Sequence, residues 1–218
     1  MPAPMIFYRC GKQGVPEAVY PDLEECFDDL CAIFRDELAD LASAGCRYAQ
    51  LDNTVTAHMC DPKIQEAVSA RGEDPMALLE RYITITNDVL DGRPSSMTVG
   101  MHLCRGNYKG QWMAEGGYTA VAERLFQGVE VDAFFLEFDS ERSGDFTPLA
   151  AMPDNKSVVL GLVSSKLATL ESKEELTECS TLLYKTQKAI CALPFIHEDT
   201  NKIVHKNFRI GQGVTGLC

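Results

Sequence analysis

The sequence predicts an α/β fold in which about five parallel strands are covered by helices. Three observations lead to this prediction. Segments with strand and helix patterns alternate along the chain. The strand segments are apolar throughout, as in a parallel sheet that is buried on both faces. Most of them also run into polar residues at their carboxyl ends, where α/β proteins place their chemistry.

The first elements are a long helix, a short strand and a second helix. A helix is predicted from Pro21 to Ala44, because apolar side chains recur at helical spacing from Leu23 onward and Gly45 follows as a stop signal. Residues 47–51 read as a short buried strand. A second amphipathic helix is predicted over 74–91, with an Asp-Pro start signal.

The remaining elements continue the alternation. They are a strand at 98–104, a glycine-rich loop at 105–117, a helix at 118–128, strands at 132–138 and 157–163, a helix at 171–188 and a strand at 189–193. A closed (β/α) barrel has eight strands and typically about 250 residues, so this pattern predicts either an open sheet or a partial TIM (β/α)8 barrel. The G-x-G-x-x-G letters at 211–216 follow no clear strand and precede no helix, so no dinucleotide loop is predicted.

Length, charge and cysteine usage restrict the class of protein. The 218 residues are 45% hydrophobic and 24% charged, which predicts a single globular domain over 1–218. A net charge of −12 argues against nucleic acid and anionic membranes as partners. The nine cysteines are odd in number and form no Cys-x-x-Cys pair, which favours reduced thiols in a cytoplasmic protein. Neither a signal peptide nor a membrane-spanning stretch is predicted.

His102 and Cys104 are the most informative pair in the chain. Residues i and i+2 of a strand point to the same face, so the imidazole and the thiol can aim at one point, and both are zinc ligands. Glu137 lies in an otherwise apolar strand, where a carboxylate must be paired or bound to metal. The alternative is a histidine and a cysteine packed in the core and a glutamate at a strand edge.

Other candidate site residues are less specific. Asp52 and Asn53 end the first strand, and Asp52 is a candidate for binding a ligand amine or for acid/base catalysis, or else for capping a helix. Trp112 lies in the glycine-rich loop and is a candidate for stacking on a flat substrate, or else for core packing. His197, just after the last predicted strand, is either a metal ligand or a surface histidine.

Several motifs together resemble one enzyme family. In order along the chain, they are GCRYAQLDNT (45–54), MHLCRGN (101–107), WMAEGGY (112–118), FLEFDSER (135–142) and VLGLV (159–163). This order is similar to that in the C-terminal catalytic barrel of cobalamin-independent methionine synthases, in particular their short single-barrel relatives. The resemblance covers about residues 15–194 and corresponds to the second half of the barrel. The tail, 195–218, diverges from it.

The resemblance implies a zinc site and a substrate contact. In the family, zinc is held by a histidine and a cysteine of a His-x-Cys strand, by a glutamate and by a later cysteine; the first three map to His102, Cys104 and Glu137. The fourth ligand does not carry over, because Ile196 stands where the cysteine belongs, and His197 is the substitute that we consider. The family aspartate that binds the amino group of homocysteine maps to Asp52.

The implied function is zinc-dependent methyl transfer to the thiol of homocysteine, giving methionine. The implied methyl donor is 5-methyltetrahydrofolate or another methyl compound. A thiol must become a thiolate to attack a methyl group, and zinc coordination achieves this near neutral pH. Two alternatives remain: a related zinc barrel that uses another thiol or reaction, and an inactive partial barrel. A homo-oligomer or a partner chain that completes the barrel is a further expectation.

Overall fold

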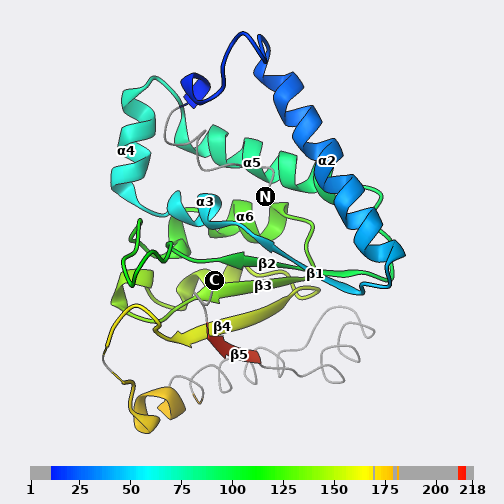
Figure 1. Ribbon diagram of the computed structural model, residues 1–218. Coiled ribbons are helices and arrows are strands. Elements are labelled where there is room, and N and C mark those ends of the chain that lie inside the picture. The colour runs from blue at the N-terminus through cyan, green and yellow to red at the C-terminus, as the bar shows by residue number, and fades with distance from the viewer. Residues whose placement is uncertain (1–10, 169, 179–180, 182–210, 215–218) are drawn as a thin grey trace, which may run out of the picture.

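A five-stranded parallel sheet forms the centre of the computed structural model (Figure 1), which describes residues 11–168, 170–178, 181 and 211–214. Every neighbouring pair of strands is parallel. The strands are β1 (Tyr48–Asp52), β2 (Thr98–Leu103), β3 (Ala133–Glu137), β4 (Ser157–Val163) and β5 (Gly211–Val214).

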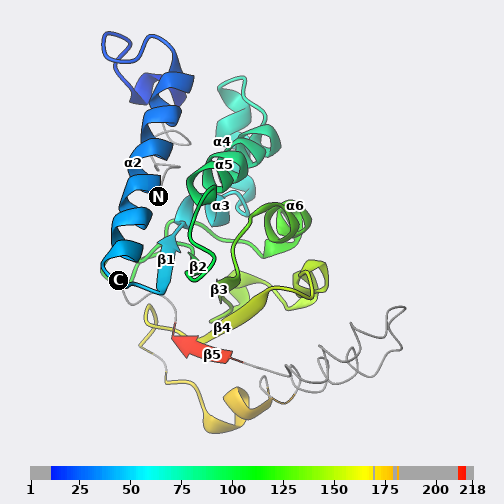
Figure 2. The ribbon, with the colours of Figure 1, turned by 90° about the vertical axis from the view of Figure 1, so that its right-hand side faces the viewer.

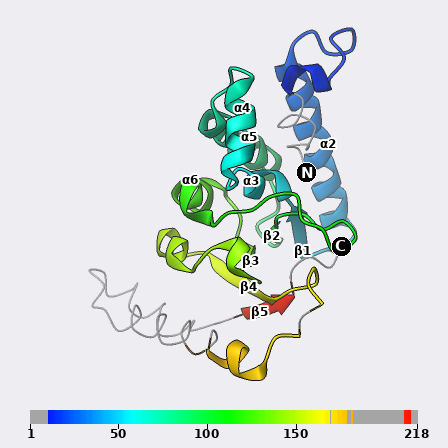
Figure 3. The ribbon, with the colours of Figure 1, turned by 90° about the vertical axis from the view of Figure 1, so that its left-hand side faces the viewer.

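The strands lie side by side in the order in which they occur in the chain, β1-β2-β3-β4-β5. A doubly wound sheet reverses its strand order part-way, whereas the strands of a (β/α) barrel follow one another in sequence. The observed order is therefore that of an arc of a barrel. Within the described residues the sheet stays open, with β1 and β5 at its edges (Figures 2 and 3).

Helices α2, α5 and α6 lie on one side of this sheet (Figure 1). The α-helices are α2 (Leu23–Ser43), α3 (Thr54–His58), α4 (Pro62–Ala70), α5 (Pro75–Leu90) and α6 (Ala122–Gly128). Short 3-10 helices are η1 (Gly11–Gly14), η2 (Tyr118–Ala120), η3 (Glu141–Ser143) and η4 (Thr147–Ala151). Among the helices of the described residues, none has the length and apolar character needed to cross a membrane.

Local capping explains where four of these helices begin. The side chains of Asp22, Asn53, Asp61 and Asp74 each accept a hydrogen bond from a backbone N–H in the first turn of α2, α3, α4 and α5. Such caps satisfy donors that the helix itself leaves free, and each contributes about 1 kcal/mol. In α4 and α5 the first helical residue is a proline, which lacks the N–H that would otherwise need a partner.

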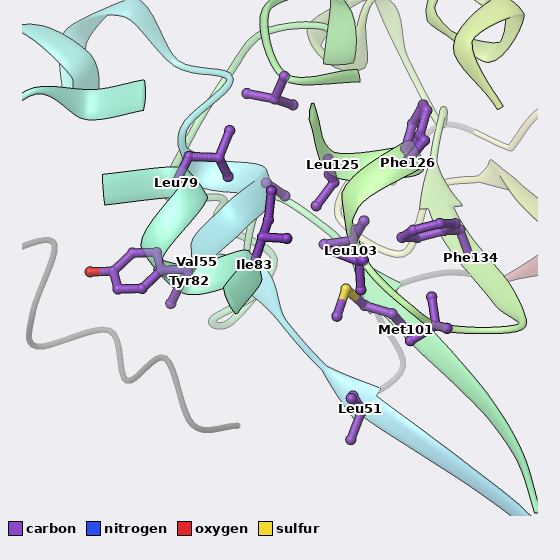
Figure 4. Close-up of a cluster of buried hydrophobic side chains, with 14 of the residues drawn as sticks. Leu51, Val55, Leu79, Tyr82, Ile83, Met101, Leu103, Leu125, Phe126 and Phe134 are labelled. Atoms are coloured by element: carbon purple, nitrogen blue, oxygen red, sulfur yellow. The ribbon is translucent and has the colours of Figure 1, made fainter. Parts of the chain in front are cut away.

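The main core lies between the sheet and its helices (Figure 4). Alternate residues of the strands point toward the helices, as period-two geometry requires, and Met101, Leu103 and Phe134 are fully buried there. Leu79 and Leu125 meet them from α5 and α6. The residues between them, including His102 and Glu137, are consequently directed to the opposite face of the sheet.

Within the described residues, the predicted elements agree with the structure in type and differ in detail. The strand predicted at 157–163 has these bounds, and the first two helices are shorter than predicted by one to two residues at each end. The helix predicted over 118–128 divides at Val121 into η2 and α6. Helices α3 and α4 were not predicted. The strand predicted at 189–193 lies outside the described residues. The fifth strand of the described sheet is formed by residues 211–214, at the start of the G-x-G-x-x-G motif.

Candidate functional site

His102 and Asp52 face one another at the carboxyl ends of β1 and β2. The two residues are paired in the register of the strands, and Nδ1 of His102 lies 2.8 Å from Oδ1 of Asp52. Because an ionised carboxylate only accepts hydrogen bonds, this contact places the proton on Nδ1. The hydrogen bond lowers the pKa of Asp52 by more than burial raises it.

The second ring nitrogen of His102 is available for a ligand. Nε2 is buried and has no hydrogen-bond partner among the described residues. Cys104, the first residue after β2, is buried beside this ring. Burial lowers the pKa of His102, but the bond with Asp52 and the contact with the Cys104 thiol outweigh it and raise that pKa to about 9. A carboxylate on one nitrogen with the other left open is the usual arrangement of a metal-binding histidine.

Glu137, at the end of β3, is fully buried and surrounded by cationic groups. Its Oε2 accepts hydrogen bonds from the Lys166 ammonium at 2.6 Å and from the Arg105 amide at 3.0 Å. Its Oε1 lies 2.6 Å from Nη1 of Arg142, as an ion pair without hydrogen-bond alignment. Burial raises the pKa of Glu137, yet these groups outweigh it and hold that pKa at about 2. The carboxylate is therefore ionised.

Arg105 and Tyr118 fix the positions of these strand ends. The Arg105 guanidinium is buried and donates to the carbonyl oxygens of Glu137 at 3.1 Å and Gly116 at 2.6 Å. It also lies over the Tyr118 ring, 4.0 Å from the centroid. The Tyr118 hydroxyl donates to the Leu103 carbonyl and accepts from the Glu137 amide, so it bridges β2 and β3. Gly116 must be glycine, because a Cβ there would collide with backbone.

Two predicted substrate contacts lie in different surroundings. The Asn53 side chain is buried and caps α3 by accepting from the Thr56 amide at 3.2 Å. Trp112 is about one-third exposed, donates to Glu115 at 2.9 Å and stacks on the Arg142 guanidinium, 4.7 Å from the ring centroid. It borders an open pocket of about 440 Å³ between α4 and residues 112–115. Their roles as substrate contacts stay predictions.

Three of the four predicted zinc ligands lie within the described residues, and the structure brings two of them together. His102 and Cys104 lie together, whereas the Glu137 carboxylate is engaged by Lys166 and Arg142. Consequently no group of three histidine, cysteine or acidic side chains in the described part of the chain is gathered to hold a metal ion. His197 lies outside that part. In this conformation the predicted ligand set does not fit a metal.

Sequence reasoning missed the cations around Glu137. Arg142 follows Glu137 by five residues, and Lys166 follows β4 after two serines, so both were visible at strand ends. The available signal was the buried glutamate itself, which needs a counter-charge as much as a metal.

Comparison with known proteins finds a likeness to the same family that the sequence motifs resemble. The chain is similar to a methionine-synthase-like protein of known structure. It matches the crystal structure of a "Putative Vitamin-B12 Independent Methionine Synthase" from Listeria monocytogenes at 31% identity and a TM-score of 0.56, over 76% of this chain and 47% of that one.

Two relatives from Bacillus subtilis, YxjH and YxjG, are both described as uncharacterized. Each is 38% identical to this chain over 80% of its length. The chain spans about half the length of these relatives, 46% in both cases. No model of a known protein family matches the sequence.

Proposed function

We propose that this chain has a methionine-synthase-like activity, the transfer of a methyl group to the thiol of homocysteine. The observation that carries the proposal is the arrangement of His102, held through Nδ1 by Asp52 at 2.8 Å with Nε2 open beside Cys104. It lies at the carboxyl end of a parallel sheet, where barrel enzymes bind substrate. The likeness to the Listeria monocytogenes protein supports the same reaction class.

Zinc is the proposed cofactor, with His102 and Cys104 as its ligands and Glu137 as a third, which would require the carboxylate to leave both Lys166 and Arg142. His197 is the proposed fourth ligand. When bound, zinc would lower the pKa of a substrate thiol so that the thiolate is the species that reacts.

Asp52 can orient His102 and contact substrate at the same time. Its Oδ1 accepts from His102, while 59% of the Asp52 side chain stays exposed. The carboxylate can therefore offer its second oxygen to a cationic group of a ligand. We propose that this group is the amino group of homocysteine, and that Trp112 contributes to the binding of the methyl donor, 5-methyltetrahydrofolate or a related compound.

The proposed setting is the cytoplasm. The five cysteines of the described residues are all free thiols, as a reducing compartment would leave them. A homo-oligomer or a partner chain that completes the barrel remains part of the proposal.

The test combines metal content with product formation in the 218-residue chain. Freshly purified protein should contain about one zinc per chain, as a structural or catalytic site would. It should form methionine from homocysteine and 5-methyltetrahydrofolate. His102→Ala and Cys104→Ser should lose both properties.

Cys46→Ser is the matched control, because it removes a thiol at the opposite end of β1, where Cys46 bonds the Tyr48 carbonyl. It should keep the zinc and the activity. Wild-type protein that contains no zinc and takes up none on titration would rule out the proposal. Zinc without methionine formation from any methyl donor would point to another thiol or another reaction.

A further inference from the structure

The open pocket beside Trp112 has the size and lining of a small-molecule site. It has a volume of about 440 Å³ and lies between α4 and residues 112–115. Neither His102 nor Glu137 is among its lining residues, so it is a separate space from the cluster at the strand ends. We propose that it binds a ring with a 2-amino-4-oxopyrimidine edge, as pterins and guanine have, stacked on Trp112 and hydrogen-bonded to Glu115.

Trp112 is held in place as a platform for stacking. Its ring lies over the Arg142 guanidinium, 4.7 Å from centroid to carbon, and its indole N–H donates to Oε1 of Glu115 at 2.9 Å. Arg142 is itself paired with Glu137 and Asp139 at 2.6 and 2.8 Å. Because Arg142 does not line the pocket, it covers the face of the indole that is turned away from it. The ring is 36% exposed, which leaves its other face for a flat ligand.

Glu115 supplies the acceptors that such a ring needs. The ring N–H and the 2-amino group lie side by side on one edge of a 2-amino-4-oxopyrimidine, and a carboxylate can accept from both at once. Among the described residues, Oε1 of Glu115 accepts only from Trp112 and keeps a further lone pair, and Oε2 has no hydrogen-bond partner. Since this carboxylate lies at the N–H edge of the indole, a ring stacked on the indole can reach it along its own edge.

The two walls of the pocket are tied together by Asp61. Its Oδ1 accepts from the Lys63 amide of α4 at 2.8 Å, and its Oδ2 accepts from the Glu115 amide at 2.9 Å. The Met113 amide also donates to the Arg105 carbonyl at 2.8 Å. The apolar part of the lining consists of Ile64, Ala67, Met113 and Ala114. The pocket is therefore formed before a ligand binds, which lowers the entropic cost of binding.

Lys63 gives the ligand a preferred charge. It lines the pocket from the first turn of α4, and within the described part of the chain its ammonium has no hydrogen-bond or ion-pair partner. A carboxylate or phosphate attached to the ring would be attracted to it, and this attraction should weaken as the salt concentration rises. The expected ligand is thus a flat ring with an anionic substituent.

Equilibrium dialysis with matched ligands tests the proposal in the wild-type chain. Pterin-6-carboxylate is compared with lumazine-6-carboxylate, in which an oxygen replaces the 2-amino group, and GMP is compared with AMP, which lacks the edge with two donors. The pterin or GMP should bind about 10-fold or more tightly than its matched partner, because a polar site rejects a ligand that leaves its groups unpaired. The tighter of the two identifies the source of the ring. Trp112, the single tryptophan, should be quenched over the same concentration range.

Variants of the two recognition residues should lose this binding. Trp112→Leu removes the platform, and Glu115→Gln replaces one acceptor of the pair by a donor while its carbonyl can still hold the indole N–H; each should weaken binding about 10-fold or more. The controls are Tyr108→Leu, an aromatic of the same loop that is 70% exposed, and Glu66→Gln on α4. Neither residue lines the pocket, and both variants should bind as wild type does. Far-UV circular dichroism checks that all four variants are folded.

The inference deepens the proposed function, because a methyl-folate carries a ring of this kind, and it rests on that function for the use of the ring. Ring binding is nevertheless measured without zinc and without methyl transfer. Wild type that binds neither pterin-6-carboxylate nor GMP, or that does not discriminate within either pair, would overturn the inference, as would undiminished binding in Trp112→Leu and Glu115→Gln. Methionine formation would then still support the proposed function. Selective ring binding by a chain that forms no methionine would have the opposite meaning.

Discussion

The contact between Asp52 and His102 determines which ring nitrogen of the imidazole is left for a ligand. A neutral imidazole has one donor and one acceptor nitrogen, and the partner of one fixes the role of the other. With Asp52 on Nδ1, Nε2 is the nitrogen left for a ligand, and a metal there must displace the proton that the raised pKa of His102 keeps on the ring at neutral pH. Asp52 is thus a positioning residue for His102 as well as a candidate substrate contact.

The first prediction concerns this contact in the metal-free protein. Asp52→Asn removes the negative charge that stabilises the imidazolium, so the pKa of His102 should fall from about 9. An NMR titration of the histidine ring resonances measures it. Asp139→Asn is the control, since Asp139 bonds Arg142 and Ser164 rather than His102. An unchanged pKa of His102 in Asp52→Asn would show that the two side chains do not interact in solution.

Glu137 holds two buried cations at the end of β3, and the second prediction concerns its contribution to stability. Glu137→Gln keeps the shape but leaves Lys166 and Arg142 without this counter-charge. Breaking a buried ion pair by removing one partner costs about 3–5 kcal/mol. Urea unfolding should show a loss of this size.

An exposed carboxylate provides the control for this stability measurement. Glu141→Gln changes a glutamate four residues away, and the stability should stay within about 0.5 kcal/mol of wild type. A Glu137→Gln variant as stable as Glu141→Gln would mean that Glu137 is not paired in solution.

At the level of elements, what could be predicted depended on how local the signal is. Helices α2 and α5 carry their caps and their apolar spacing within their own residues or next to them. Their predicted bounds therefore differ from the observed ones by at most two residues. Helix α3 is five residues long, too short for a periodic pattern, and was missed. Strand β5 reads Gly-Gln-Gly-Val, which has little strand propensity, and its place next to β4 is set by long-range pairing.

The candidate site followed the same rule. The His-x-Cys spacing is a local signal, and Cys104, the first residue after β2, does lie beside His102. The partner of Glu137 comes from a distant part of the chain: Lys166 lies 29 residues further on, in the loop after β4. The sequence shows that Glu137 needs a partner but not whether a metal or a lysine provides it, because both are compatible with a buried carboxylate.

A third prediction concerns the junction of β2 and β3. Asp132 accepts two hydrogen bonds from Arg93, at 2.8 and 3.1 Å, and one from the Val99 amide at 2.7 Å. Burial raises the pKa of Asp132, but these bonds outweigh it and lower the pKa below 3.8. Its stabilising effect is therefore complete above pH 3.8 and is lost as the pH falls through the lowered pKa.

Asp132→Asn tests this pH dependence. At pH 7 the variant should be less stable by about 1 kcal/mol or less, since Asp132 is 43% exposed and water screens the pair. Below the lowered pKa of Asp132 the difference between variant and wild type should shrink toward zero. Urea midpoints measured from pH 2.5 to 7 give this comparison. A difference that is constant with pH would contradict an ionic contribution.

For the whole molecule, the sheet divides the residues into two sets with different roles. Side chains on one face pack against helices, and those on the other include His102 and Glu137. The chain matches about half of the length of its relatives. Whether its sheet is completed by a partner or a second copy stays a prediction.

Close packing on the face opposite the helices gives the last prediction. Gly100 of β2 lies between Tyr48 of β1 and Phe135 of β3, and a Cβ there would lie 2.7 Å from the Phe135 ring and 2.9 Å from the Tyr48 hydroxyl. Gly100→Ala should therefore destabilise the protein by about 1–3 kcal/mol, as overpacking does. In a Phe135→Leu background the smaller side chain leaves room for the added methyl, so the same substitution should cost less. A double-mutant cycle of unfolding free energies measures this coupling between β2 and β3. Additive effects would show that the strands do not approach as closely in solution, and that the face bearing His102 and Glu137 is looser than the site requires.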